Sequence, residues 1–70
     1  MREIEITSEP VELYKILKFE GLASSGGEAK SLIDSGQVSV NGAIEKRKRK
    51  KIVSGDVIGF MGEEFNIRHG

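Results

Sequence analysis

The spacing of apolar residues constrains this chain most, because it changes from one period to another along the sequence. Apolar residues recur at three- and four-residue intervals in 13–17 and 29–33, which places them on one face of a helix. Polar and apolar residues alternate in 2–7 and again from residue 37 onward, as is typical of half-buried strands. This order predicts an α+β domain, with two short helices packed on one face of a small antiparallel β-sheet.

Capping residues predict where the two helices begin and end. Ser8–Pro10 predicts the start of the first helix, because proline is tolerated in a first turn. Gly21 predicts its end, since glycine readily adopts the left-handed conformation at a helix C-terminus. Ser25 and Glu28 have the spacing of a capping box and predict the start of the second helix. Gly36 predicts its end.

The second half of the chain reads as a series of short strands. Val38 and Val40 point one way with Ser39 between them, and Asn41-Gly42 is a strong hairpin signal. Ile44 lies on the returning side of that hairpin. The remaining predicted strands and turns follow in order: 52–53, the turn 54–56, 57–60, the turn 62–63, and 65–67. We expect the strand at 2–7 to join the sheet beside the last one.

Length and composition exclude several kinds of protein. Seventy residues suffice for one domain, which we assign to residues 1–70. With no cysteine and one histidine, neither a disulfide nor a metal cluster of the usual kinds is expected. No apolar run approaches the ~20 residues of a membrane span, and the N-terminus lacks the apolar core of a signal peptide. We expect an unprocessed, monomeric, cytoplasmic protein without a cofactor, a membrane partner or a small-molecule substrate.

Residues for catalysis are scarce. Histidine is the usual base near neutral pH, and the only one, His69, lies one residue from the chain end. The acids Glu3, Glu5, Glu9 and Glu12 fall on the polar faces of the first predicted elements, where a solvated charge is the usual state. We therefore expect a protein that is not an enzyme.

The distribution of charge points to a polyanion as partner. Eleven basic and eleven acidic residues give a net charge of zero, but six bases are adjacent: Lys46, Arg47, Lys48, Arg49, Lys50 and Lys51. These cations repel one another, and phosphates relieve that repulsion while releasing counterions. Such a run can also be a solvated loop or a nuclear localisation signal. We favour a nucleic-acid contact, because the run lies inside a folded domain and not on a tail.

Two glycines follow the predicted cap of the second helix. Gly26 and Gly27 leave backbone N–H groups unobstructed beside Ser25, at the positive end of the helix dipole. The pair therefore allows an anion site, and equally a tight turn between the helices. Both interpretations remain open at this point.

The aromatic residues bear on how a nucleic acid is recognised. Phe60 and Phe65 alternate with polar residues and look like core, whereas Tyr14 and Phe19 lie beside the apolar stripe of the first helix. None of them neighbours the basic run in the sequence. We therefore expect recognition of the shape and backbone of a folded RNA, and not stacking of successive bases.

The pattern from Ser25 to Ile58 resembles the RNA-binding domain named after ribosomal protein S-four, also called the αL RNA-binding motif. The matching positions are Ser25, Ala29, Leu32, Ile33, Gly36, Val38, Val40, Asn41, Gly42, Ile52, Gly55, Asp56 and Ile58. With the upstream helix, the likeness covers about residues 11–60 and is most similar to small, stand-alone bacterial members. The resemblance implies the helix–helix–sheet fold and structured RNA, usually ribosomal or transfer RNA, as ligand.

Two departures from the family pattern affect the expected site. Gly26 stands where the family commonly has arginine, and Glu12-Leu13-Tyr14 stands where its first helix commonly opens with Arg-Leu-Asp. Lys30 matches a position that is often basic, and the run Lys46–Lys51 can compensate for the missing arginines. We thus predict RNA binding, with ribosomal RNA favoured, by Ser25–Gly27, Lys30 and Lys46–Lys51. A protein-interaction adaptor and a duplex-DNA binder are the alternatives.

Overall fold

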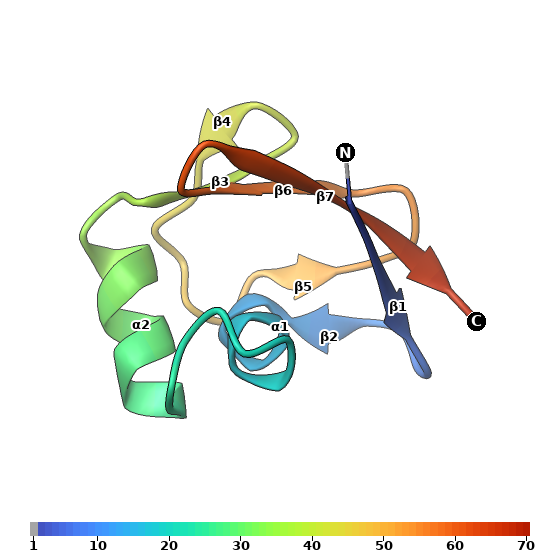
Figure 1. Cartoon of the computed structure of the whole chain (residues 1–70), viewed down its shortest axis with the longest axis horizontal. Coiled ribbons are helices and arrows are strands. Elements are labelled where there is room, and N and C mark those ends of the chain that lie inside the picture. The colour runs from blue at the N-terminus through green and yellow to red at the C-terminus, as the bar shows by residue number, and fades with distance from the viewer. Residues whose placement is uncertain (1) are drawn as a thin grey trace.

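The computed structural model describes residues 2–70. Two helices, α1 (Leu13–Phe19) and α2 (Gly26–Asp34), lie on one side of a five-stranded sheet (Figure 1). The strands of that sheet lie in the order β1-β7-β6-β3-β4. Their bounds are β1 Arg2–Ile6, β3 Val38–Val40, β4 Ala43–Ile44, β6 Val57–Phe60 and β7 Glu63–His69. A separate pair joins β2 (Val11–Glu12) to β5 (Lys51–Ile52). The predicted α+β class is confirmed.

The sheet is mixed and not wholly antiparallel. Strand β1 lies beside β7, as expected, but the two run parallel, with Ile4 opposite Ile67. The other neighbouring strands are antiparallel. The prediction of an antiparallel sheet is therefore wrong for this one pairing. Strands β1 and β7 lie at opposite ends of the chain, and period-two alternation carries no information about strand direction.

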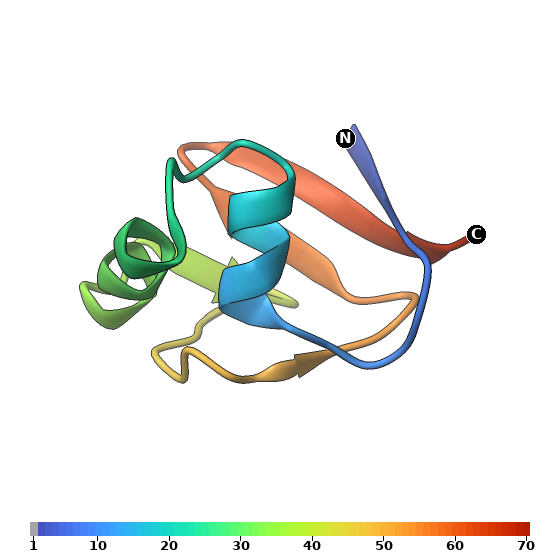
Figure 2. The same cartoon turned by 90° about the horizontal axis from the view of Figure 1, so that it is seen from below.

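The core lies between the sheet and the helices. Alternate residues of the strands are buried, and they form one core with the apolar stripe of each helix. Figure 2 views the molecule from the helix side, with α1 in front of the sheet and α2 at its edge. The side chains of Leu13, Leu17, Ile33, Ile52 and Ile58 are fully buried. Leu32 is only partly buried and packs against the edge of this core.

The second helix and the hairpin after it form as predicted. Ser25 is the N-cap of α2, and Gly36 follows its end with a φ of 81°. Asn41 and Gly42, both with positive φ, make the turn between β3 and β4. The later turn is shifted by one residue from the prediction, because Met61 and Gly62 make it and Glu63 already belongs to β7.

The first helix begins later than predicted. Residues 7–9 form a bend, Val11–Glu12 pairs with Lys51–Ile52, and α1 starts only at Leu13. Pairing with β5 holds Glu12 in the extended conformation, with φ −69° and ψ 140°. The helix cannot start before that strand ends. Proline is compatible with a helix start, but a tertiary pairing decides the position here.

Candidate nucleic-acid interface

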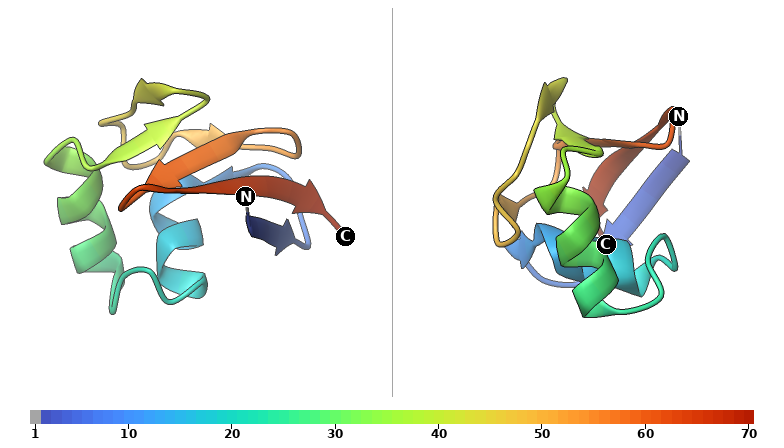
Figure 3. Two further views of the ribbon diagram at one scale, coloured as in Figure 1. Left: turned by 45° about the horizontal axis from the view of Figure 1, so that its top comes forward. Right: turned by 90° about the vertical axis from the view of Figure 1, so that its left-hand side faces the viewer.

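The basic run forms the connection from the sheet back to the helices. Lys46–Lys50 joins β4 to β5, and Lys51 is the first residue of β5. We call residues 46–51 the basic loop. Figures 1 and 3 show this segment descending from β4, beside α2, to the start of α1. The basic loop is thus close to both helices and does not project into solvent by itself.

The backbone of the basic loop caps the first helix. The Leu13 N–H donates to the Lys50 carbonyl at 3.0 Å, and the Tyr14 N–H donates to the Lys48 carbonyl at 3.1 Å. No side chain caps α1, so these carbonyls satisfy two of the N–H groups that a helix start leaves without an intrahelical partner. The Lys50 N–H donates to the Arg47 carbonyl at 3.2 Å and closes the turn. The carbonyls of Lys48 and Lys50 thus face α1, while residues Lys48 and Arg49 are exposed.

Glu45 partly neutralises the loop. Its carboxylate accepts hydrogen bonds from the Arg47 side chain at 2.9 and 3.2 Å and from the Arg47 backbone N–H at 3.1 Å. Hydrogen bonding by the Arg47 side chain lowers the pKa of Glu45, and the same bonds raise the pKa of Arg47. Sequence reasoning missed this residue, although the acid directly precedes the run.

The two ends of the basic loop lie apart from its turn. A Cβ placed on Gly36 would lie 3.5 Å from the Lys46 Cε, so the stem of Lys46 packs beside the C-terminal end of α2. Lys51 pairs with Glu12 in the short β2–β5 ladder. The run therefore does not present six equivalent charges on one surface. Residues 48–50 form the part nearest the start of α1.

The start of α2 is capped as predicted, with one change of partner. The Ser25 hydroxyl accepts from the Glu28 N–H at 3.1 Å, but the Glu28 carboxylate accepts from the Ser24 N–H at 2.6 Å, and not from Ser25. Gly26 and Gly27 form the first turn. The Glu28 carboxylate thus lies beside the expected anion site and lowers its positive potential.

Tyr14 connects the basic loop to α2. Besides its backbone bond to Lys48, its ring lies 4.7 Å from the Lys30 ammonium, a cation–π distance. A Cβ on Gly26 would lie 3.8 Å from the same ring. The interpretation that no aromatic residue neighbours the basic run is therefore wrong in space. Tyr14 is far from the run in the sequence, so no local pattern could have indicated the contact.

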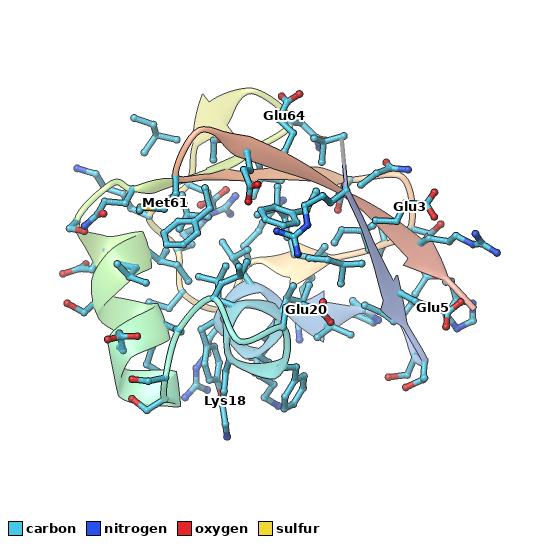
Figure 4. The ribbon with its side chains drawn as sticks, viewed as in Figure 1. Glu3, Glu5, Lys18, Glu20, Met61 and Glu64 are labelled. Carbon is cyan, nitrogen blue, oxygen red and sulfur yellow. The ribbon has the colours of Figure 1, made fainter. Side chains whose placement is uncertain are left out.

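The structure thus brings most of the predicted residues onto one side of the molecule. The loop turn, Tyr14, Lys30 and the start of α2 are linked by direct contacts. Figure 4 shows Lys18 projecting from α1 away from the sheet, whereas Glu64 projects from the opposite side of the molecule. No helix within residues 2–70 is long and apolar enough to cross a membrane.

This fold and this arrangement of loop and helices define an αL-type domain. The family model described as "S4 domain" matches residues 4–68, nearly the whole chain, and the chain belongs to this family. The Escherichia coli (strain K12) protein named "Putative RNA-binding protein YbcJ" is 49% identical over 57 residues, which are 81% of each chain. YbcJ of Shigella flexneri gives the same identity and coverage.

A solved structure supports the same assignment. The solution structure of YbcJ from E. coli is described as revealing an αL motif involved in RNA-binding. It superposes on this chain with a TM-score of 0.72 and 43% identity, covering 97% of this chain and 87% of the other. The resemblance stated from the sequence is therefore confirmed at the level of family and fold.

Proposed function

We propose that this chain is a non-enzymatic, monomeric, cytoplasmic protein that binds the backbone of structured RNA, with ribosomal RNA as the favoured ligand. The observation that carries the proposal is the link between the basic loop and both helices in a member of the S4-domain family. The description of the YbcJ structure as an αL motif involved in RNA-binding supports it.

In this proposal the turn of the basic loop supplies most of the affinity. The carbonyls of Lys48 and Lys50 are fixed on α1, so the loop keeps its shape without RNA and less ordering entropy is lost on binding. Lys48 and Arg49 then contact phosphates directly, and each contact releases counterions. Arg47 contributes less, because Glu45 already occupies its guanidinium group.

In this proposal the start of α2 contributes mainly to the orientation of the bound RNA and less to the affinity. The Ser25 hydroxyl can donate to a phosphate oxygen while it accepts from Glu28, and Gly26 and Gly27 present N–H groups nearby. Lys30 supplies the positive charge that the Glu28 carboxylate removes. Together these groups would hold one phosphate at a fixed distance from the loop.

The test is the salt dependence of affinity for a structured ribosomal RNA fragment. We expect the double variant Lys48→Ala/Arg49→Ala to bind all RNAs more weakly, with a slope of log affinity against log salt smaller by about 2. The matched control is Arg2→Ala/Arg68→Ala, which removes two exposed arginines that pair with Glu63 and Glu3 on the β1–β7 side. This control should keep the wild-type slope.

Competition separates the ligand classes. Duplex DNA with the same number of phosphates should compete poorly, since only RNA has a 2′-hydroxyl group and A-form geometry. Equal competition by DNA would contradict the RNA assignment. Partners that stay bound to the chain after nuclease treatment would instead support a protein adaptor.

A further inference from the structure

The outward face of α1 carries aromatic and basic side chains that the proposed phosphate contacts do not use. Phe19 is 68% exposed, and the Lys18 ammonium lies 5.9 Å from the centre of its ring. Figure 4 shows Lys18 projecting away from the sheet on this side of the molecule. Aromatic rings beside lysines are the usual platform on which unpaired bases stack.

Phe19 also forms part of a groove between α1 and β1. The groove has a volume of about 560 Å³, and apolar side chains that include Ile4, Val11 and Ile16 line it. Ile4 and Ile16 belong to the buried core, so this wall is rigid. The groove is therefore a preformed hollow with one aromatic wall, large enough for a nucleobase.

Charged groups line the same groove and largely balance. The carboxylates of Glu12 and Glu20 line it together with Lys15 and Lys51, whereas the Glu5 carboxylate lies beside Gly70 at the end of the chain. The Lys15 ammonium lies 3.4 Å from the Glu12 carboxylate, and Lys51 is the residue opposite Glu12 in the backbone register of the β2–β5 ladder. The Glu12 carboxylate is therefore compensated, whereas the Glu20 carboxylate remains as a hydrogen-bond acceptor.

We propose that this groove binds one unpaired nucleobase that carries an exocyclic amino group, from the same RNA that the basic loop contacts. The inference rests on the proposed function and specifies its ligand as a structured RNA with an unpaired nucleotide beside the stem. The base stacks on Phe19, and its amino group donates to the carboxylate of Glu20. Lys51, which belongs to the basic loop and lines the groove, lies where its phosphate would enter.

Continuity with the basic loop favours a base over a peptide segment. Lys51 is both the last residue of the loop and a lining residue of the groove. An RNA backbone that follows the loop past α1 therefore reaches the groove directly. The near balance of charge around it suits an uncharged ring with polar edges better than a strongly basic peptide.

The first experiment compares two hairpin RNAs, one with a blunt stem and one with a short single-stranded cytidine extension. We expect wild type to bind the extended RNA more tightly, and Phe19→Ala to lose about 5- to 150-fold of affinity for it alone. Ile44→Ala is the matched control, because Ile44 is 66% exposed and does not line the groove. It should bind both RNAs as wild type does.

Outcomes of this comparison separate the two proposals. If wild type binds both hairpins equally, or if Phe19→Ala weakens both to the same extent, the groove proposal is overturned and RNA binding by the loop stands. If wild type binds neither hairpin, both proposals fail. A uridine extension should bind more weakly than cytidine, because uracil replaces the amino group with a carbonyl that carboxylates repel.

Fluorescence gives a direct readout of stacking. The chain has no tryptophan, so Phe19→Trp introduces a single indole whose emission is quenched when a base stacks on it. We expect quenching by the cytidine-extended hairpin and not by the blunt one, with no change for Ile44→Trp. Unchanged emission of Phe19→Trp at saturating extended RNA would overturn the groove assignment.

Discussion

The two helices of this protein begin in different ways. Helix α2 begins with a local device, because the Ser25 hydroxyl accepts from the Glu28 N–H three residues later. Helix α1 has no side-chain cap and begins where the carbonyls of Lys48 and Lys50 accept from its first N–H groups. One start is encoded locally, and the other depends on a distant segment that is also the proposed RNA-binding loop.

This difference connects fold and function. Anything that moves the basic loop must also disturb the first turn of α1, whereas the start of α2 can form by itself. The proposed RNA contact therefore involves two helix starts. That of α2 forms locally, and that of α1 forms only with the basic loop in place. The four predictions that follow test this contrast.

The largest effect is expected at the anchor of the loop. Ile52 is fully buried in β5, directly after the basic loop, and lies opposite Val11. Ile52→Ala should lower the free energy of unfolding by about 2–5 kcal/mol, because it leaves a cavity beneath the β2–β5 pair. Chemical denaturation measures this, with Val53→Ala, at a 40% exposed neighbouring site, as the mild control. A loss below that of the control would contradict the anchoring role.

The local cap of α2 should matter less. Ser25→Ala removes the acceptor for the Glu28 N–H and should cost about 1 kcal/mol of stability. Hydrogen exchange should then show faster opening at the start of α2 and unchanged protection of the Leu13 and Tyr14 amides. Loss of protection at both helix starts would show that they are not independent.

A smaller effect of opposite sign is expected at Gly27. This residue has no positive φ, and an added Cβ would meet only the Ser25 Oγ at 3.8 Å. Gly27→Ala should therefore stabilise the chain, by less than about 1 kcal/mol because the site lies in the first turn. If the N–H groups here contact a phosphate, the methyl group should also weaken RNA binding. Greater stability with unchanged affinity would show that Gly27 does not contact the RNA.

The smallest effect concerns the acid that precedes the loop. Arg47 lowers the folded-state pKa of Glu45 below its value in the unfolded chain, so the pair stabilises the fold above the unfolded-state pKa. This contribution is lost as the pH falls through the lowered pKa. An NMR titration of the Glu45 carboxyl should give a higher pKa in Arg47→Ala than in wild type. Equal pKa values of Glu45 in the two proteins would mean that the hydrogen bonds between Arg47 and Glu45 do not persist in solution.

The contrast between the helix starts also explains what the sequence could predict. The second helix, the Asn41-Gly42 turn and the strand Val57–Phe60 follow from residues close to one another in the chain, and all three are confirmed. The start of α1 and the parallel direction of β1 depend on pairing with distant strands. Local propensity cannot report such pairings.

The candidate site shows the same division. The position of the basic loop in the sequence could be predicted directly. Its contacts could not: Lys46 packs beside Gly36, Arg47 binds Glu45, and the carbonyls of Lys48 and Lys50 cap α1. Phe19 stood beside the apolar stripe of its helix, and nothing local revealed that it borders a groove shared with β1. Contacts between distant segments determine which charges and rings are available to a ligand.

The most direct test of the account is an NMR titration of the full chain with a structured ribosomal RNA fragment, followed through the backbone amides. The account predicts shift changes at Leu13, Tyr14, 25–30 and 46–51, and little change on the outward face of β7 at Glu64 and Asn66. Changes concentrated on that sheet face, with the basic loop and the helix starts unaffected, would contradict it.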